Sequence, residues 1–334
     1  MSLSHFEFLS PTTVTEALSL MAERGGKLQV LAGGTELMGR LKHGLVNPSC
    51  VMSLKRVRSL VGIKNRTRTL VIGAGTTLRE LAESPLIPDA LKAVSQAARL
   101  VAAPALRNLA TVGGNLLQNS RCLYYNQSAL VRGGLGPCFK LGGTVCHAVK
   151  GGKRCFSVYQ GDLAPALIAV GARAKLQNLG SSRTVAIEEL FTGKGKAPFV
   201  LAGGELLTEI VLPVSVKPSV SAYQKFRLRG SIDYPLASAA VFLSTGKKGV
   251  IDSARIVVGA AGPAPKIVAE AGSAITGKKA QNVVAEQVGT FAAKAVEAVN
   301  NMPLPGPYRR KIAAVLTRRA LQEALIDLAQ VSNA

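Results

Sequence analysis

Apolar and polar positions in the amino-terminal part of the chain recur with the periods of helices and strands. A capping box at Thr13 and Glu16 opens an apolar stripe of helical spacing that stops at Gly25. Strands are predicted at 27–32 and 50–54, and a Gly-Gly-Thr turn with a short helical pattern lies between them. This order predicts a small α/β unit.

The same two periods continue in the middle of the chain. A strand is predicted at 69–75, a second capping box at Thr77 and Glu80 opens a helix, and the Ala- and Leu-rich residues 86–103 have a helical pattern. After a long stretch without a pattern of its own, residues 161–179 predict an apolar helix followed by a strand. The middle of the chain therefore predicts strands and helices on both sides of a long loop.

The carboxyl-terminal third predicts a separate domain. A strand at 205–213 ends at Pro213, and we place the interdomain linker at 216–224. Strands then alternate with two helices, at about 280–300 and 307–330, which is an α+β pattern. The predicted divisions are a first domain at 1–215 with parts at about 1–56 and 57–215, an inserted loop at about 121–159, and a second domain at 220–330.

Charge narrows the classes of partner. The 334 residues carry a formal net charge of +22, but the basic residues are scattered, aromatic residues make up only 4% and Trp is absent. Nucleic-acid-binding proteins typically show clustered basic runs or aromatic stacking platforms, so that class is disfavoured. An excess of one sign steers association, and we favour acidic protein partners or a larger complex.

Neither a targeting segment nor a membrane span is predicted. Residues 1–26 carry acidic side chains and lack a basic region followed by an apolar run. No run of about 18 apolar residues occurs. These observations predict a cytoplasmic protein, and in that compartment clustered cysteines are metal ligands more often than disulfides.

Two glycine loops share one pattern, VLAGGTEL at 30–37 and ATVGGNLL at 110–117. Paired glycines accept positive φ and let consecutive N–H groups point at an anion, so the two loops could hold a dinucleotide pyrophosphate. A single Gly-Gly loop more often forms a tight turn than an anion-binding site. The similar stretch LAGGELL at 201–207 is predicted to form only a hairpin before a strand. The spacings match neither a Rossmann fingerprint nor a P-loop, which disfavours nicotinamide and ATP.

Four of the five cysteines lie in the unpatterned, Gly- and Lys-rich stretch: Cys122, Cys138, Cys146 and Cys155. They lack the close C-x-x-C pairs of zinc ribbons, whereas a 4Fe-4S cube takes four thiolates without a fixed pair spacing. The spacing therefore favours iron–sulfur over zinc, and small buried residues are a third reading. We interpret His147 as a loop residue rather than a ligand, and Cys50 as a core residue of a strand.

The order of the motifs resembles a known family. Five motifs occur in the order seen in FAD-binding subunits of molybdenum hydroxylases, which include xanthine and CO dehydrogenases: LAGGTEL, LRNLATVGGNLLQNS, GDLAPALIAVGA, ELLTEIVLP and YQKFRLRGSIDYPLASAAV. The resemblance covers nearly the whole chain. It implies a vanillyl-alcohol-oxidase-like (PCMH-type) FAD-binding domain of two α/β subdomains. It also implies a carboxyl-terminal α+β domain of the CO dehydrogenase flavoprotein type, with a three-stranded antiparallel sheet.

An insertion of about 40 residues after Ser120 departs from the usual family pattern. It resembles one branch, the β subunit of 4-hydroxybenzoyl-CoA reductase, in which such an insertion holds a 4Fe-4S cluster. This resemblance implies that the four cysteines bind that cluster. It also implies reductive dehydroxylation of 4-hydroxybenzoyl-CoA to benzoyl-CoA at a molybdenum cofactor on another chain, so no catalytic residue is assigned here.

The family resemblance also assigns FAD contacts. It implies that the first loop wraps the pyrophosphate, the second loop takes its other side, and Asp162 and Lys225 lie near the flavin. The residues so assigned are Gln29, Val30, Leu31, Ala32, Gly33, Gly34, Thr35, Glu36, Val101, Ala110, Thr111, Val112, Gly113, Gly114, Asn115, Asp162, Leu207 and Lys225. Without the resemblance, Asp162 would be an ordinary helix N-cap and Lys225 a solvated strand residue.

The implied role is electron entry. An acidic ferredoxin would reduce the cluster or the flavin, and a small subunit with 2Fe-2S clusters would pass electrons to the molybdenum subunit, in a dimer of heterotrimers. Two alternatives stay open. One is the flavin subunit of another molybdenum hydroxylase that works oxidatively, with a structural metal in the cysteine loop. The other is a basic, zinc-binding nucleic-acid protein, which bound flavin would exclude.

Overall fold

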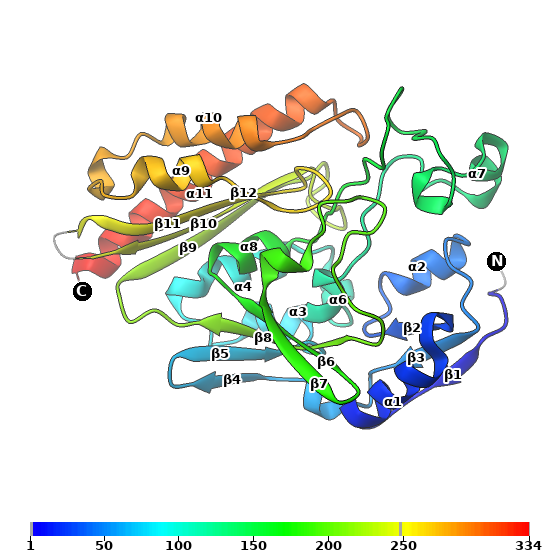
Figure 1. Cartoon of the computed structure of the whole chain (residues 1–334). Coiled ribbons are helices and arrows are strands. Elements are labelled where there is room, and N and C mark those ends of the chain that lie inside the picture. Colours follow the sequence, from blue (N-terminus) through cyan, green and yellow to red (C-terminus); the bar gives the residue numbers. More distant parts are fainter. Residues whose placement is uncertain (1–2, 247–248, 334) are drawn as a thin grey trace.

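Three sheets organise the chain (Figure 1), and the computed structural model describes residues 3–246 and 249–333. The first sheet is parallel, in the order β1-β3-β2. Its strands and the helices between them are β1 (Glu7–Leu9), α1 (Val14–Arg24), β2 (Leu28–Leu31), α2 (Leu37–Lys42) and β3 (Cys50–Ser53). Leu18, Cys50 and Met52 are buried in the small core of this subdomain, which confirms the prediction for Cys50.

The second sheet is antiparallel, in the order β4-β5-β8-β6-β7. Its strands are β4 (Ile63–Arg66), β5 (Thr69–Gly73), β6 (Arg173–Asn178), β7 (Ser181–Ala186) and β8 (Leu206–Pro213). The helices of this subdomain are α3 (Leu78–Glu83), α4 (Lys92–Leu100), α5 (Pro104–Arg107), α6 (Val112–Leu116) and α8 (Leu163–Ala169). The largest hydrophobic core lies here, because the apolar helix α8 is buried along its whole length.

A reciprocal cap fixes the start of α3, as the spacing of Thr77 and Glu80 predicts. Thr77 Oγ1 accepts from the Glu80 N–H at 3.2 Å, and the Glu80 carboxylate accepts from the Thr77 N–H at 2.8 Å. The other predicted box is looser, because Glu16 reaches the N–H of Thr12 instead of that of Thr13. Both helices nevertheless begin at the residue after the predicted cap.

Thr77→Ala is expected to lower the free energy of unfolding by about 1 kcal/mol, because the Glu80 N–H then loses its acceptor at the helix end. Urea unfolding of the purified chain measures the change. Arg79→Ala on the same turn is the control, since this side chain is 60% exposed, and its effect should stay within about 0.5 kcal/mol. Equal losses in the two variants would contradict the role of the cap.

The third sheet forms the carboxyl-terminal domain and is antiparallel, in the order β12-β11-β10-β9. The elements of this domain are β9 (Ser219–Phe226), β10 (Ala237–Thr245), β11 (Ile251–Gly259), β12 (Lys266–Ile267), α9 (Ala269–Ile275), α10 (Ala285–Ala295) and α11 (Gly306–Asn333). The three long strands are the predicted sheet, and β12 adds two residues at its edge. One face packs on α11 and the other on α4 and α8 of the second subdomain.

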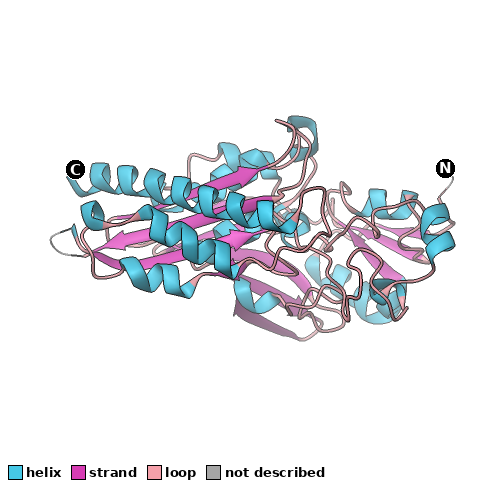
Figure 2. Ribbon diagram, turned by 90° about the horizontal axis from the view of Figure 1, so that it is seen from above, coloured by secondary structure: helices cyan, strands magenta, loops and turns pink. Residues whose placement is uncertain are grey.

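Both domains therefore share one layer of helices, and the ends of the chain lie at opposite ends of an elongated molecule (Figure 2). The predicted linker at 216–224 extends too far, because β9 already begins at Ser219. Residues from Ser219 onward pack against α4 as part of the sheet. The connection between the domains is therefore residues 214–218. The helix predicted at 86–103 is shorter than expected, because α4 spans only Lys92–Leu100.

The insertion that carries the four cysteines projects from the amino-terminal domain beside α2 (Figure 1). Its two ends are joined, because Arg121 and Val158 exchange backbone hydrogen bonds of 2.9 and 2.7 Å. The sequence predicts no regular element in this stretch, and that prediction is wrong in one place, because α7 (Ala129–Leu135) forms where Ser128 caps the N–H of Val131. None of the helices in the described ranges is long and apolar enough to cross a membrane.

Candidate cofactor-binding site

The first glycine loop connects the end of β2 to α2. Gln29, Val30 and Leu31 lie in the strand, and Ala32 to Glu36 form the turn. Gly34 has a φ of +77°, and a Cβ on Gly33 would overlap the carbonyl oxygen of Leu109. Among the described residues, no acceptor is found for the N–H groups of 33–36. The turn therefore presents a row of free backbone donors, which is the arrangement that binds anions.

The second glycine loop differs in its hydrogen bonding. The N–H groups of Val112 and Gly113 donate to the carbonyls of Thr76 and Ala74 at 2.9 and 2.8 Å, which fastens the loop to the turn after β5. The side chain of Thr111 accepts from the Gly114 N–H at 3.1 Å, and its carbonyl accepts from the Asn115 N–H at 2.9 Å. These four N–H groups are therefore engaged within the protein.

The two loops meet where Gly33 lies against Leu109 and Ala110. A side chain at Gly33 would separate them, so glycine is required at this contact. Asn115 is buried and accepts from the N–H of Leu163 at 3.1 Å, which ties the second loop to the start of α8. The predicted pyrophosphate site therefore combines donors from one loop with a rigid backbone wall from the other.

Asp162 and Lys225 form a buried ion pair between the two domains. Their side chains are 3% and 1% exposed, and the closest N–O distance is 2.9 Å. The Asp162 carboxylate also accepts from Tyr223 Oη at 2.9 Å, and Lys225 Nζ donates to the Leu100 carbonyl at 3.0 Å. The Asp162 carboxylate makes no hydrogen bond to the start of α8, so Asp162 is not an ordinary helix N-cap. Lys225 is buried, so it is not a solvated strand residue.

Burial acts on both members of this pair in opposite directions. It raises the pKa of Asp162, and the Lys225 ammonium counteracts that rise. It lowers the pKa of Lys225, and the Asp162 carboxylate counteracts that fall. Each charge therefore stabilises its partner in a place from which water is excluded.

Three neighbours of this pair are absent from the set assigned by sequence. Tyr223 and Lys225 alternate along β9, and Arg227, the residue after the strand, donates to the Leu100 carbonyl at 2.9 Å. Arg107 donates to the Val101 carbonyl at 2.8 Å, and burial lowers the pKa of its guanidinium group. The alternation in YQKFR is the sequence signal that could have identified Tyr223 and Arg227, because alternate residues share one face of a strand.

The two apolar residues assigned to FAD contact, Val101 and Leu207, lie in different elements. Val101 follows the last residue of α4 and is half-buried against the main core. Leu207 is 3% exposed and lies in β8, opposite Leu176 of β6. The structure thus puts both residues in the FAD-binding domain, and their contact with a flavin ring stays a prediction.

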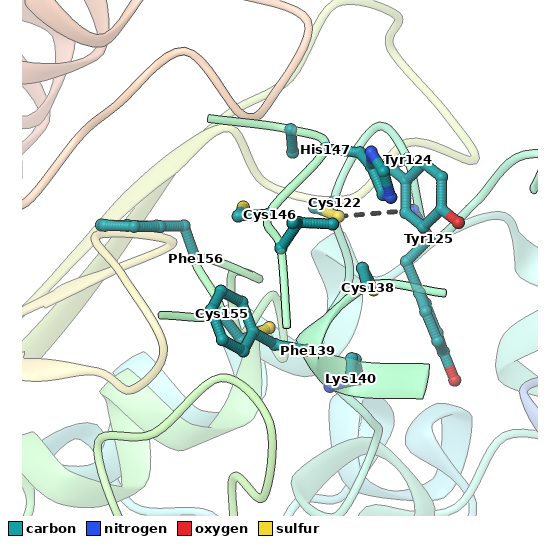
Figure 3. Close-up of a pocket in the computed structure, with 12 residues that line it drawn as sticks. Cys122, Tyr124, Tyr125, Cys138, Phe139, Lys140, Cys146, His147, Cys155 and Phe156 are labelled. Atoms are coloured by element: carbon teal, nitrogen blue, oxygen red, sulfur yellow. Dashed lines mark hydrogen bonds between the residues drawn. The ribbon is translucent and has the colours of Figure 1, made fainter. Parts of the chain in front are cut away.

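The four cysteines of the insertion line one cavity, and Figure 3 shows their side chains around a common space. Cys122 and Cys138 are buried, while Cys146 and Cys155 are half-buried. The Tyr125 N–H donates to Cys122 Sγ at 3.3 Å, and burial raises the pKa of the Cys122 thiol to about 11. Within the described ranges, no group of three Cys, His, Asp or Glu side chains is arranged to hold a metal ion.

Lys140 and His147 also line this cavity. Lys140 Nζ donates to Ser120 Oγ at 2.8 Å and to the Gly195 carbonyl at 2.7 Å. Burial lowers the pKa of Lys140 to about 8, and anionic sulfur at Cys155 opposes that shift. His147 stacks on Tyr124 with ring centroids 4.5 Å apart, and its Nε2 is buried without a partner among the described residues.

Both domains hold the cavity in place. Asn301 of the carboxyl-terminal domain accepts from the Leu123 N–H at 3.2 Å through its carbonyl, and its side chain donates to the Phe156 carbonyl. The buried Arg309 donates to Asn301 Oδ1 at 3.2 Å. Arg121, at the base of the insertion, contacts the Glu36 carboxylate at 3.2 Å, so the insertion also adjoins the first glycine loop.

Comparisons with known proteins agree with this arrangement. Residues 4–215 match the FAD binding domain in molybdopterin dehydrogenase, and residues 221–324 match the CO dehydrogenase flavoprotein C-terminal domain. The carbon monoxide dehydrogenase medium chain of Afipia carboxidovorans is 28% identical, over 96% of each chain. The nicotinate dehydrogenase FAD-subunit of Eubacterium barkeri is 24% identical, over 79% of this chain and 77% of its own.

A solved structure shares the fold over nearly the whole chain. A carbon monoxide dehydrogenase chain from Hydrogenophaga pseudoflava superposes with a TM-score of 0.81 at 24% identity and covers 98% of this chain and 99% of its own. The PCMH-type FAD-binding domain and the carboxyl-terminal domain expected from the motifs are therefore confirmed. The chain belongs to the FAD-binding subunits of the molybdenum hydroxylase family, of the carbon monoxide dehydrogenase medium-chain type.

Proposed function

We propose that this chain is the electron-transfer flavoprotein subunit of a molybdenum hydroxylase complex that oxidises its substrate. The main support is the first glycine loop, whose free N–H groups lie at the end of a strand and face no protein acceptor among the described residues. The relatives named above are called dehydrogenases. Similarity to them favours this oxidative reading over the reductive one that the insertion implies.

The roles of the residues in this proposal follow from their contacts. The N–H groups of Gly33, Gly34 and Thr35 bind the diphosphate of FAD, and the second loop forms the opposite wall. The buried Asp162 and Lys225 orient the flavin end at the seam between the domains. Bound FAD supplies the redox chemistry, while these residues bind it, orient it and exclude water.

Substrate chemistry in this proposal belongs to partner subunits. The relatives are named as a medium chain and an FAD-subunit, and both names describe one member of a larger complex. A molybdenum-cofactor subunit and a 2Fe-2S subunit are the partners we propose here. Copurification with two further chains, one of which carries molybdenum, is the expected result for the native complex.

Flavin content and the direction of electron flow test the proposal. The native complex should hold one FAD per copy of this chain, and flavin reduced by substrate should pass its electrons to NAD⁺ or a quinone. A chain that binds no flavin would overturn the proposal. Reduction by a ferredoxin, coupled to dehydroxylation of 4-hydroxybenzoyl-CoA, would replace the oxidative direction by the reductive one.

The four-cysteine cavity favours a second candidate, in which the subunit also carries a 4Fe-4S cluster and works in a 4-hydroxybenzoyl-CoA reductase. Four thiols face one space and no three of them form a site for a single ion within the described ranges. In a cubane cluster each thiolate binds a different iron, so its ligands stand further apart than those of one ion. Four thiols lining one cavity supply the donor set that such a cluster takes.

Replacing any one of the four cysteines by Ser is expected to remove most of the bound iron and to leave FAD bound, because the glycine loops lie outside the cavity. Iron, acid-labile sulfide, zinc and flavin are measured on chains purified without oxygen. Cys50→Ala is the control, since this buried cysteine belongs to a separate core. Full iron retention in all four variants would contradict the assignment, and zinc in the native chain would replace the cluster by a structural metal.

A further inference from the structure

Lys140 is the charged side chain that reaches into the four-cysteine cavity. Its ammonium group contacts three neutral acceptors: Ser120 Oγ at 2.8 Å, Ser157 Oγ at 3.4 Å and the Gly195 carbonyl at 2.7 Å. It also lies 5.3 Å from the centre of the Tyr125 ring. None of these groups carries a negative charge, so hydrogen bonding alone does not neutralise the lysine.

Carboxylates are missing from this part of the chain. From Ala90 to Gly161 the sequence contains no Asp or Glu. No ion pair of Lys140 with a carboxylate occurs among the described residues. Among the described residues, the groups beside the ammonium that can carry a negative charge are the sulfurs of the four cysteines lining the same cavity. Cys155 Sγ lies 3.3 Å from Ser157 Oγ, which itself accepts from Lys140 Nζ.

The geometry around this lysine is closely packed. Ser120 and Ser157 hydroxyls lie 2.8 Å apart, and both donate to the Gly195 carbonyl. A Cβ on Gly195 would lie 2.7 Å from Ser157 Oγ and 2.8 Å from the Cys155 carbonyl, so the loop at Gly195 approaches the insertion as closely as backbone allows. These contacts hold the ammonium group in one place, and a mobile surface lysine would lack them.

We propose that Lys140 is a positioning residue of the four-cysteine site, which holds one positive charge against the sulfurs and thereby raises the reduction potential of the cluster bound there. The proposal rests on the second candidate function, in which this subunit carries a 4Fe-4S cluster. A fixed cation favours the reduced state, because that state carries one more negative charge, and the effect is strong where water is excluded. Lysine side chains in water, such as Lys150, have a much weaker effect.

The test is a redox titration of the 4Fe-4S signal, resolved from the partner 2Fe-2S signals by electron paramagnetic resonance, in the anaerobically purified complex. Lys140→Gln keeps a side-chain donor and removes the charge, and it should shift the midpoint to a more negative potential. The ratio of reduced to oxidised cluster at the native midpoint should fall roughly tenfold, which corresponds to about 59 mV for a one-electron couple. Lys140→Arg keeps the charge and should restore a potential close to the native one.

Lys150→Gln is the matched control, because it removes the same charge from an exposed position in the same insertion. A shift confined to Lys140→Gln and reversed in Lys140→Arg supports the proposal. Equal potentials in Lys140→Gln, Lys150→Gln and the native complex, with iron retained, would overturn it and leave the cluster standing. A native complex with no iron beyond that of the 2Fe-2S subunit would overturn the 4Fe-4S cluster and the role of Lys140 with it.

Discussion

Gly33→Ala is expected to weaken FAD binding at least about 100-fold, which corresponds to about 2.7 kcal/mol. The added Cβ would overlap the carbonyl oxygen of Leu109, which is backbone and cannot rotate away. The two glycine loops must then move apart, and the free N–H groups of the first loop lose their place beside the second. Titration of FAD into the flavin-free chain, followed by absorbance, measures the dissociation constant.

Gly39→Ala is the matched control for this experiment. Gly39 lies in α2, only six positions later, and a Cβ there meets no atom within 4 Å. Alanine also has the higher helix propensity, so this variant should bind FAD like the native chain. Unchanged flavin affinity in a folded Gly33→Ala chain would remove the two loops from the cofactor site.

Asp162→Leu is expected to lower the free energy of unfolding by about 3–5 kcal/mol, because it leaves the Lys225 ammonium buried without a counter-charge. Among the described residues, Lys225 then keeps the Leu100 carbonyl as its acceptor. Chemical denaturation of the flavin-free chain measures this loss. The double variant Asp162→Leu with Lys225→Met removes both charges and should recover most of the stability, because two apolar side chains pack without that penalty.

An exposed pair provides the comparison. Lys175 and Glu209 lie on neighbouring strands, 3.7 Å apart and about one-third exposed, so Glu209→Ala should cost no more than about 1 kcal/mol. If Asp162→Leu costs no more than Glu209→Ala, the interdomain pair does not stabilise the chain. If the double variant is as unstable as the single one, lost packing explains the effect better than an unpaired charge.

Local signals predicted much of the fold. Each predicted capping box opens a helix at the next residue, because the cap depends on side chains only three positions apart. The first glycine loop also follows from local sequence, since Gly34 has the positive φ that paired glycines allow. The grouping of four cysteines in one segment predicts a shared site, and the structure places all four around one cavity.

Features that depend on contacts between residues far apart in the sequence could not be predicted from local patterns. The pairing of Asp162 with Lys225 joins two domains, and no spacing along the chain shows it. The end of the predicted linker is misplaced because of another long-range contact. Lys217 and Pro218 resemble a loop, whereas the strand after them is buried by α4. The role of Lys140 depends on Gly195, which lies 55 positions later on another loop.

The hydrogen-bonded ends of the insertion have a consequence for how this chain is built. Since Arg121 and Val158 exchange both backbone hydrogen bonds, the segment between them is a closed excursion that leaves the framework and returns to the same point. The entropy cost of closing such a loop rises only slowly with its length. The segment can therefore vary in length without rerouting the framework, because its entry and exit points stay together.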